Sequence, residues 1–154
     1  MKKRVFILVS VILLLAGCSK GAETKKSEDS EVSQDKQEFK TKLIQNTKMK
    51  LLSVEAMQSG VDEKKKIIKL QFEIKNEDST VIGIGGSDFK LQAEKKQYSV
   101  ISDANNIGQE IEVGKEIKGN IYFEVPENLK KAELVYIPNK KMLGKWDLII
   151  PQSK

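Results

Sequence analysis

The chain contains no histidine and a single cysteine, Cys18, among its 154 residues. Without histidine it cannot use Ser–His–Asp or Cys–His catalysis, a His-based zinc site, or the commonest general base at neutral pH. A lone cysteine cannot close an intramolecular disulfide, so a folded domain depends on its apolar core alone. No recognisable acid pair replaces these groups. We therefore expect a protein that is not an enzyme and that holds no cofactor or metal.

Long apolar runs are also absent, because none reaches the roughly 20 residues that span a bilayer. The longest run, residues 5–16, is interrupted by one serine and follows the basic segment 1–4. It ends in the small residues Ala16 and Gly17, directly before Cys18. A basic start, a short apolar run and a small-residue end form the pattern of a secretory signal peptide, and we predict one over residues 1–17.

The four residues Leu15-Ala16-Gly17-Cys18 resemble the lipobox of bacterial lipoproteins. The resemblance implies a diacylglyceryl group on the Cys18 thiol and cleavage between Gly17 and Cys18. Two acyl chains hold a protein on a membrane where a single chain binds reversibly. We therefore expect a lipid anchor in the cell membrane, on its extracytoplasmic face. The alternatives are an ordinary signal peptide that happens to carry a cysteine and an uncut N-terminal anchor.

The net charge of +5 comes mostly from the signal segment. Three of the 27 basic residues, Lys2, Lys3 and Arg4, lie there without any acid, which leaves 24 basic against 22 acidic groups. Lysines and glutamates are interspersed along the remainder, as on a solvated surface. Nucleic-acid binding, which needs a concentrated basic face, is therefore not expected.

Large apolar side chains are scarce between residues 19 and 40, where Val32 is the only large aliphatic residue. Such a composition cannot bury enough apolar surface to offset the conformational entropy lost on folding. We predict a flexible polar tether over residues 18–44, beginning at the lipidated cysteine. The remaining length suits one folded domain, over residues 45–154.

Alternating apolar and polar residues mark this domain. In residues 68–75 four apolar side chains alternate with four polar ones, as in a strand with one buried and one wet face. Turn residues recur about every 8–12 positions, and no stretch has the period of an amphipathic helix. These features predict an all-β fold, an antiparallel sandwich of about seven to eight strands. The other predicted strands are 49–57, 89–92, 97–100, 117–125, 132–137 and 146–150, and the short β-branched run 80–84 would add an eighth.

Twelve side chains are expected to face the core, because they alternate with polar residues along these strands. They are Leu70, Phe72, Ile74, Phe89, Leu91, Ile121, Phe123, Val125, Leu134, Tyr136, Trp146 and Leu148. At about 1.5–3 kcal/mol per buried large side chain, they favour folding by tens of kcal/mol, which chain entropy opposes. The inward face of residues 49–57 is ambiguous.

Three segments resemble a known family. They read Phe-Glu-Ile-Lys-Asn at 72–76, Ser-Asp-Phe-Lys-Leu at 87–91, and Val-Gly-Lys through Phe-Glu-Val-Pro at 113–126, and Lys-Trp follows at 145–146. In order and spacing they are similar to the telokin-like, immunoglobulin-fold domain of unknown function of Gram-positive surface lipoproteins, a family distantly similar to a secreted mycobacterial antigen. The resemblance implies an immunoglobulin-like sandwich at the cell surface, and it brings no catalytic residues. The hairpin tip at 93–96 departs from the Asp and Gly common in relatives.

The stretch Gly83-Ile84-Gly85-Gly86 is rich in glycine, as phosphate-binding loops are. A phosphate cradle needs backbone amides at a helix N-terminus, and no helix begins here. The Gly-Lys-Ser/Thr that completes a P-loop is also missing. A bend at the end of a strand is therefore the favoured interpretation.

A second stretch supplies oxygen atoms from Asp103, Asn105, Asn106 and Glu110, as a calcium site would. The spacing of an EF-hand is missing. Ordinary turn residues are favoured over a calcium site.

Lysine runs and aromatic residues are the remaining candidates. The runs 64–66 and 140–141 would suit contact with anionic lipid or wall polymer, although solvated strand ends are favoured. Trp146 and Tyr136 would suit a ligand groove, although their alternation with aliphatic residues favours core positions.

Two functions follow from these features. The first is a membrane-anchored extracytoplasmic lipoprotein whose immunoglobulin-like domain is a non-catalytic binding module at the cell envelope. Its partners would be the membrane, through the diacylglyceryl-cysteine, and an envelope protein or wall polymer. The alternative is a structural or stress-related envelope lipoprotein that acts as a spacer without a specific ligand. Neither the partner nor the oligomeric state follows from the sequence.

Overall fold

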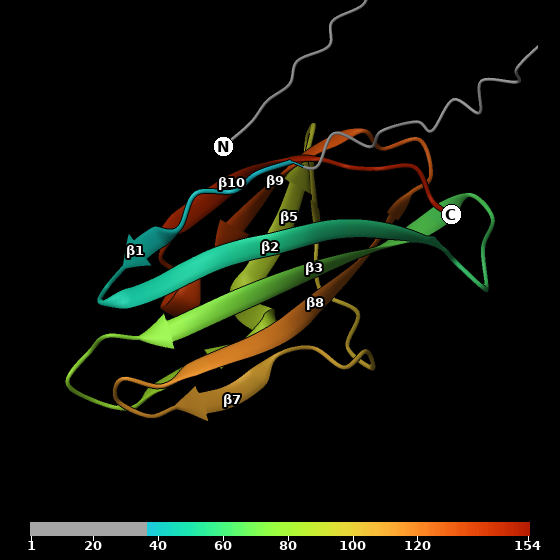
Figure 1. The fold of residues 1–154 in the computed structure, drawn as a ribbon. Coiled ribbons are helices and arrows are strands. Elements are labelled where there is room, and N and C mark those ends of the chain that lie inside the picture. The colour runs from blue at the N-terminus through green and yellow to red at the C-terminus, as the bar shows by residue number, and fades with distance from the viewer. Residues whose placement is uncertain (1–36) are drawn as a thin grey trace, which may run out of the picture. The chain divides into compact units, whose positions relative to one another are not determined.

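The computed structural model describes residues 37–154, which form an antiparallel β-sandwich (Figure 1). The strands are β1 (Lys42–Ile44), β2 (Thr47–Gln58), β3 (Lys65–Asn76), β4 (Ile82–Gly85), β5 (Phe89–Ala93), β6 (Lys96–Tyr98), β7 (Gly108–Ile111), β8 (Glu116–Pro126), β9 (Lys131–Tyr136) and β10 (Gly144–Ile149). One sheet has the order β1-β2-β3-β8, the other has β10-β9-β5-β6, and β4 pairs with β7. Two 3-10 turns lie at Gly86–Asp88 and Pro138–Lys140. The expected all-β sandwich is confirmed, while the predictions for residues 1–17 and Cys18 concern residues outside this part.

The described chain has ten strands, whereas the sequence pattern predicted seven to eight. The difference comes from short edge strands. β1 has three residues and β7 has four, too few to show a period of two. The predicted strand at 97–100 is also divided, because β6 ends at Tyr98 and Val100 instead bridges to Phe123 on β8.

A bulge in β2 changes which side chains face the core. The register against β3 shifts between Leu51 and Ser53. Before the shift the odd-numbered Met49 and Leu51 are buried, and after it the even-numbered Ala56 is buried. An extra residue in one strand reverses the alternation that follows it. The buried residues of 49–57 therefore do not follow one alternation along the sequence, which is why their inward face was ambiguous.

All twelve side chains expected in the core are buried. β3 lies between β2 and β8, and its inward residues Ile68, Leu70, Phe72 and Ile74 have no solvent exposure. The ring centroid of Phe72 lies 5.4 Å from that of Phe89 and 5.4 Å from that of Trp146, both on the opposite sheet. Aromatic pairs at such separations add to the stability given by burial alone. These contacts hold the two sheets together.

The inward face of β3 has a polar residue at each end. At the first end Lys66 is only 2% exposed, and its ammonium Nζ donates a hydrogen bond to the carbonyl of Pro151 over 3.0 Å. Burial lowers the pKa of Lys66, and the nearby carboxylate of Glu127 partly opposes this effect. The bond ties the C-terminal segment to the start of β3.

At the other end of β3, the side chain of Asn76 is fully buried and uses both of its polar atoms. Its Nδ2 donates to the carbonyls of Thr80 and Ile111, each over 2.8 Å. Its Oδ1 accepts from the backbone N–H of Asp78 over 2.8 Å. One side chain therefore fixes the β3–β4 loop against the end of β7.

The folded unit begins before residue 45, where the sequence placed its boundary. β1 pairs with β2 at residues 42–44, and Phe39 packs against the core. The side chain of Gln37 donates to the carbonyl of Asp147 and accepts from the backbone N–H of Ile149, each over 2.9 Å. Three residues cannot show a strand pattern in a polar sequence, so the sequence assigned them to the tether.

Candidate functional site

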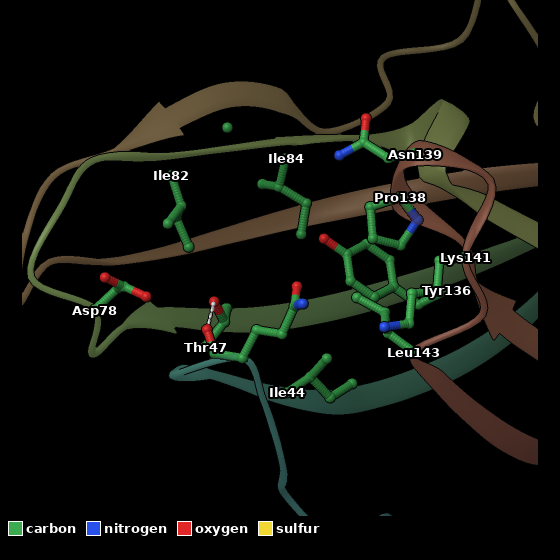
Figure 2. Close-up of a pocket in the computed structure, with 12 residues that line it drawn as sticks. Ile44, Thr47, Asp78, Ile82, Ile84, Tyr136, Pro138, Asn139, Lys141 and Leu143 are labelled. Atoms are coloured by element: carbon green, nitrogen blue, oxygen red, sulfur yellow. Dashed lines mark hydrogen bonds between the residues drawn. The ribbon is translucent and has the colours of Figure 1, made fainter.

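A hollow of about 600 Å³ lies at one end of the sandwich (Figure 2). It is enclosed by the turn between β1 and β2, the β3–β4 loop, strand β4 and the loop between β9 and β10. Its lining residues are Ile44, Gln45, Thr47, Asp78, Ile82, Gly83, Ile84, Tyr136, Pro138, Asn139, Lys141 and Leu143. Pockets of this volume bind small molecules or a few side chains of a partner.

The floor of the hollow is apolar. Ile82 and Ile84 are two residues apart on β4, so their side chains share one face of the strand. Figure 2 shows both pointing into the hollow, opposite Ile44 from β1. Tyr136 and Leu143 close the floor, where the backbone N–H of Leu143 donates to the carbonyl of Tyr136 over 2.9 Å. The floor therefore offers an apolar group a surface removed from water.

The hydroxyl of Tyr136 is a polar group within the hollow. Its ring reaches from β9 into the hollow (Figure 2) and packs on Phe89, with centroids 4.9 Å apart. Burial raises the pKa of Tyr136 to about 12, and the carboxylate of Asp88 pushes it in the same direction. Within residues 37–154 the hydroxyl has no hydrogen-bond partner. It is thus a protonated donor that is free for a ligand.

The rim carries one charge of each sign. Hydrogen bonding lowers the pKa of Asp78, first through the backbone N–H of Ser79, which lies 2.7 Å from its Oδ1. Lys141 is exposed on the loop between β9 and β10. Figure 2 places Asp78 and Lys141 at opposite sides of the hollow. The arrangement can orient a ligand that has polar groups at its ends.

Two tight turns shape the rim. Gln45 and Asn46 have φ values of 46° and 56°, and Asn139 and Lys140 have 51° and 64°. Positive φ is uncommon for residues other than glycine, and asparagine adopts it most readily among them. The two-residue turn at 45–46 joins β1 to β2, so it sets the position of Ile44 in the floor.

The glycine-rich stretch 83–86 is a strand end, as expected. It completes β4 and begins a 3-10 turn of three residues, Gly86–Asp88. Gly86 is needed for packing, because a Cβ there would lie 2.8 Å from Cβ of Asn106. Its backbone N–H donates to the carbonyl of Ile107 over 2.7 Å.

The oxygen-rich loop after β6 also has a structural role. The Nδ2 of Asn106 donates to the carbonyl of Ile101 over 2.6 Å, and its Oδ1 accepts from the backbone N–H of Tyr122 over 2.9 Å. At the edge of β8 this side chain therefore accepts a backbone hydrogen bond that a neighbouring strand would otherwise accept. No group of three acidic or Cys ligands for a metal occurs within residues 37–154.

The lysine run 64–66 does not form one charged surface. Lys64 is exposed, Lys65 pairs with Glu124 over 2.8 Å, and Lys66 turns into the core. The run 140–141 is exposed, and Lys141 lines the hollow. The sequence therefore identified a residue of the site without identifying the site itself.

Of the two aromatic candidates, the structure places one in the hollow. Trp146 is 3% exposed and packs in the core, as expected, and Lys42 Nζ lies 5.8 Å from its ring centroid. Tyr136 belongs to both the core and the hollow. The rest of the floor was missed, because its residues come from strands that are distant in sequence. Its only sequence signal was Pro138-Asn139, which marked a turn.

Residues 37–154 contain no helix with the length and apolar character that crossing a membrane requires.

A family profile described as a domain of unknown function, DUF4352, matches residues 24–145. No curated protein matches the sequence. Among solved structures, the fold is similar to a candidate lipoprotein, ycdA, from Bacillus subtilis, with 20% identity and a TM-score of 0.60. That alignment covers 73% of this chain and 39% of ycdA, so the chain spans about two fifths of that protein.

Two further structures share the fold. The yjhA protein from Bacillus subtilis is 15% identical, with a TM-score of 0.52 over 74% of this chain and 98% of its own. The secreted protein MPT63 from Mycobacterium tuberculosis is 15% identical, with a TM-score of 0.55 over 71% of this chain and 91% of its own. At these identities the likeness establishes the fold and indicates no catalytic family.

Proposed function

The chain belongs to the DUF4352 family, whose function is unknown, and we propose that it is a lipid-anchored binding module at the cell envelope. In this proposal Cys18 carries a diacylglyceryl group after cleavage behind Gly17. The polar segment that follows links the anchor to an immunoglobulin-like sandwich, which binds an envelope partner in its end hollow. The domain acts by binding and carries out no reaction.

The anchor is supported by the Leu15–Cys18 sequence and by its position after a basic and then an apolar segment. The structures of similar fold include a candidate lipoprotein and a secreted protein. Both descriptions agree with an extracytoplasmic location. We therefore assign the domain to the outer side of the cell membrane.

The observation that carries the binding role is the apolar hollow with the free hydroxyl of Tyr136 in it. Exposed apolar side chains lie at the same end of the sandwich. The described residues expose seven large apolar side chains, and three of them, Val81, Val113 and Met142, lie on loops at this end. Exposed apolar groups that cluster at one place are typical of interaction sites.

The chemistry of the hollow suits an apolar group that carries a hydrogen-bond acceptor. Such a group would lie on Ile44, Ile82 and Ile84 and accept a hydrogen bond from Tyr136. Side chains of a protein or peptide offer this combination. A wall polymer offers mainly sugars and phosphates, which would leave the apolar floor without a matching surface.

The test uses anilinonaphthalene sulfonate, a dye with apolar rings and one anionic acceptor that fluoresces when it leaves water. We expect the unacylated chain to increase its fluorescence in a saturable manner. Replacing Ile82→Trp fills the hollow with a larger side chain and should abolish the increase. Val61→Trp adds the same side chain at an exposed position at the opposite end of the sandwich and should preserve it.

Circular dichroism and urea unfolding must show that both variants remain folded, because loosely packed proteins also bind this dye. Equal fluorescence with the two variants, or none with the original chain, would contradict binding in the hollow. That outcome would favour the spacer function.

A further inference from the structure

The end of the sandwich opposite the hollow carries four exposed lysines, Lys95, Lys96, Lys130 and Lys131. They lie on the hairpin between β5 and β6 and at the start of β9. Three of them, together with Glu94, line a concave surface of about 710 Å³. We call these four residues the lysine end.

The lysine end differs from the faces of the sheets in how its charge is balanced. On the faces, three lysines pair with glutamates on neighbouring strands: Lys69 with Glu55, Lys118 with Glu73 and Lys145 with Glu133, at 3.2, 3.1 and 2.8 Å. Within residues 37–154, no carboxylate lies within 4.0 Å of the ammonium groups of the lysine end. Of the nearby acids, Asp62 lies 4.0 Å from Lys65 and Glu127 accepts from Ser153. Glu94, next to Lys95 in the chain, is exposed and has no such partner among the described residues.

The chain joins the sandwich beside the lysine end. Gln37 bonds to the backbone of Ile149, and Ile149 is the partner of Lys131 in the pairing of β10 with β9. The backbone N–H of Ile150 donates to the carbonyl of Lys130 over 2.9 Å. Gln37 and Lys131 are thus both held to Ile149, from opposite sides of β10.

We propose that the lysine end docks on anionic phospholipid headgroups of the membrane that holds the anchor. The proposal rests on the lipid anchor of the proposed function. Eighteen residues, 19–36, connect Cys18 to Gln37. Fully extended they reach at most about 65 Å, and as a flexible coil about 23 Å. The anchor therefore keeps this end within reach of the headgroups.

The test measures binding of the chain from residue 18, with Cys18→Ser to remove acylation, to sedimenting lipid vesicles. One set contains phosphatidylglycerol and phosphatidylcholine in equal parts, and the other contains phosphatidylcholine alone. We expect binding to the anionic vesicles only, and weaker binding at high salt because ions screen the attraction.

Two variants form a matched pair, because each removes two adjacent exposed lysines from one end of the sandwich. Lys130→Gln with Lys131→Gln should weaken binding about 25-fold, since each lysine near an anionic surface strengthens it about fivefold. Lys140→Gln with Lys141→Gln, at the opposite end, should leave binding within about twofold. Folding is checked by urea unfolding of both.

Absence of binding to anionic vesicles, or equal loss in the two variants, would overturn docking at the lysine end. Binding to isolated wall polymer with none to vesicles would overturn it in favour of the polymer. These outcomes are separate from the proposed function, because dye binding in the end hollow and acylation of Cys18 are measured independently of the vesicles.

Discussion

The side-chain Nδ2 of Asn76 donates a hydrogen bond to the carbonyl of Ile111 over 2.8 Å, at a place where Asn76 is fully buried and Ile111 is 1% exposed. The bond joins the end of the central strand β3 to the end of β7. The same side chain holds the β3–β4 loop, which carries Asp78 on the rim of the hollow. One buried amide thus connects the core with the candidate site.

Replacing Asn76→Ala should lower the free energy of unfolding by about 3 kcal/mol, because three backbone groups lose their partner, including the buried carbonyl of Ile111. Urea unfolding followed by circular dichroism measures the loss. Asn105→Ala, on an exposed loop, is the control and should change stability by less than about 0.5 kcal/mol. Similar losses in both variants would show that the buried bonds of Asn76 are not important for stability.

Gly86→Ala should destabilise the domain by about 1–3 kcal/mol, because its Cβ would meet Cβ of Asn106 at 2.8 Å. Asn106 cannot move away easily, since its side chain bonds to Ile101 and Tyr122. Gly83→Ala, three residues earlier, has no atom within 4 Å of the added Cβ and should be tolerated. Thermal unfolding compares the two, and a Gly86→Ala variant as stable as Gly83→Ala would refute the packing argument.

The buried ammonium of Lys66 should make stability rise with pH in the alkaline range. Folding lowers its pKa below the ordinary value, so the unfolded chain binds more protons between the two pKa values. The cost of burying the charge is therefore fully present below this window and is lost as the pH rises through it. Lys65 and Lys145 have raised pKa values and act in the opposite direction, so a comparison with Lys66→Met isolates the effect.

Urea unfolding of both proteins between about pH 8 and 10.5 gives the measurement for Lys66. The stability of the original chain should increase relative to that of Lys66→Met as the pH rises. If the stability of the original chain relative to Lys66→Met stays constant or decreases as the pH rises, burial does not disfavour the charged form of Lys66.

Tyr136→Phe should weaken dye binding in the hollow about fivefold to tenfold, the effect of one lost hydrogen bond. Stability should change little, because the hydroxyl has no partner within residues 37–154. Since the pKa of Tyr136 is about 12, dye binding should not change from neutral pH to about pH 10, where an ordinary tyrosine is half ionised. Unchanged dye affinity in Tyr136→Phe would exclude the hydroxyl from the site.

Replacing Cys18→Ala should release the protein into the medium or leave it unprocessed, because no other residue can accept the diacylglyceryl group. Fractionation of cells and mass spectrometry of the purified chain measure location and processing. Ser19→Ala, the next position, should remain on the membrane with its acyl chains. Membrane retention of Cys18→Ala at the processed mass would disprove the lipid anchor.

The sequence predicted those parts of the fold that depend on local alternation. Residues 68–75 lie within β3 and have the inward face that their pattern required, including Phe72. It did not predict that Lys66 faces the core, because a charged residue at a strand end normally lies in water and its burial depends on the distant carbonyl of Pro151. It also left the face of β2 undefined, since the bulge after Leu51 has no signature of its own.

The hollow could not be predicted for a related reason. Its floor combines Ile44, Ile82 and Ile84 with Tyr136 and Leu143, which come together only when the two sheets pack. Tyr136 was expected in the core, whereas Ile44 was assigned to the tether and Ile82 and Ile84 were not among the expected core residues; Ile44, Ile84 and Tyr136 are buried. What distinguishes them is an empty neighbouring volume, which depends on the backbone conformation of loops.

The attachment of Gln37 to β10 has a consequence for what the hollow can reach. Strands β3 and β9 each run from the lysine end to the hollow, over twelve and six residues, or about 40 and 20 Å. In an orientation with the lysine end against the bilayer, the hollow lies about 20–40 Å above the lipid. In that orientation the hollow takes its ligand from the aqueous space beyond the headgroups. The ligand is then a soluble molecule or a soluble segment of a protein, and not a lipid of the membrane.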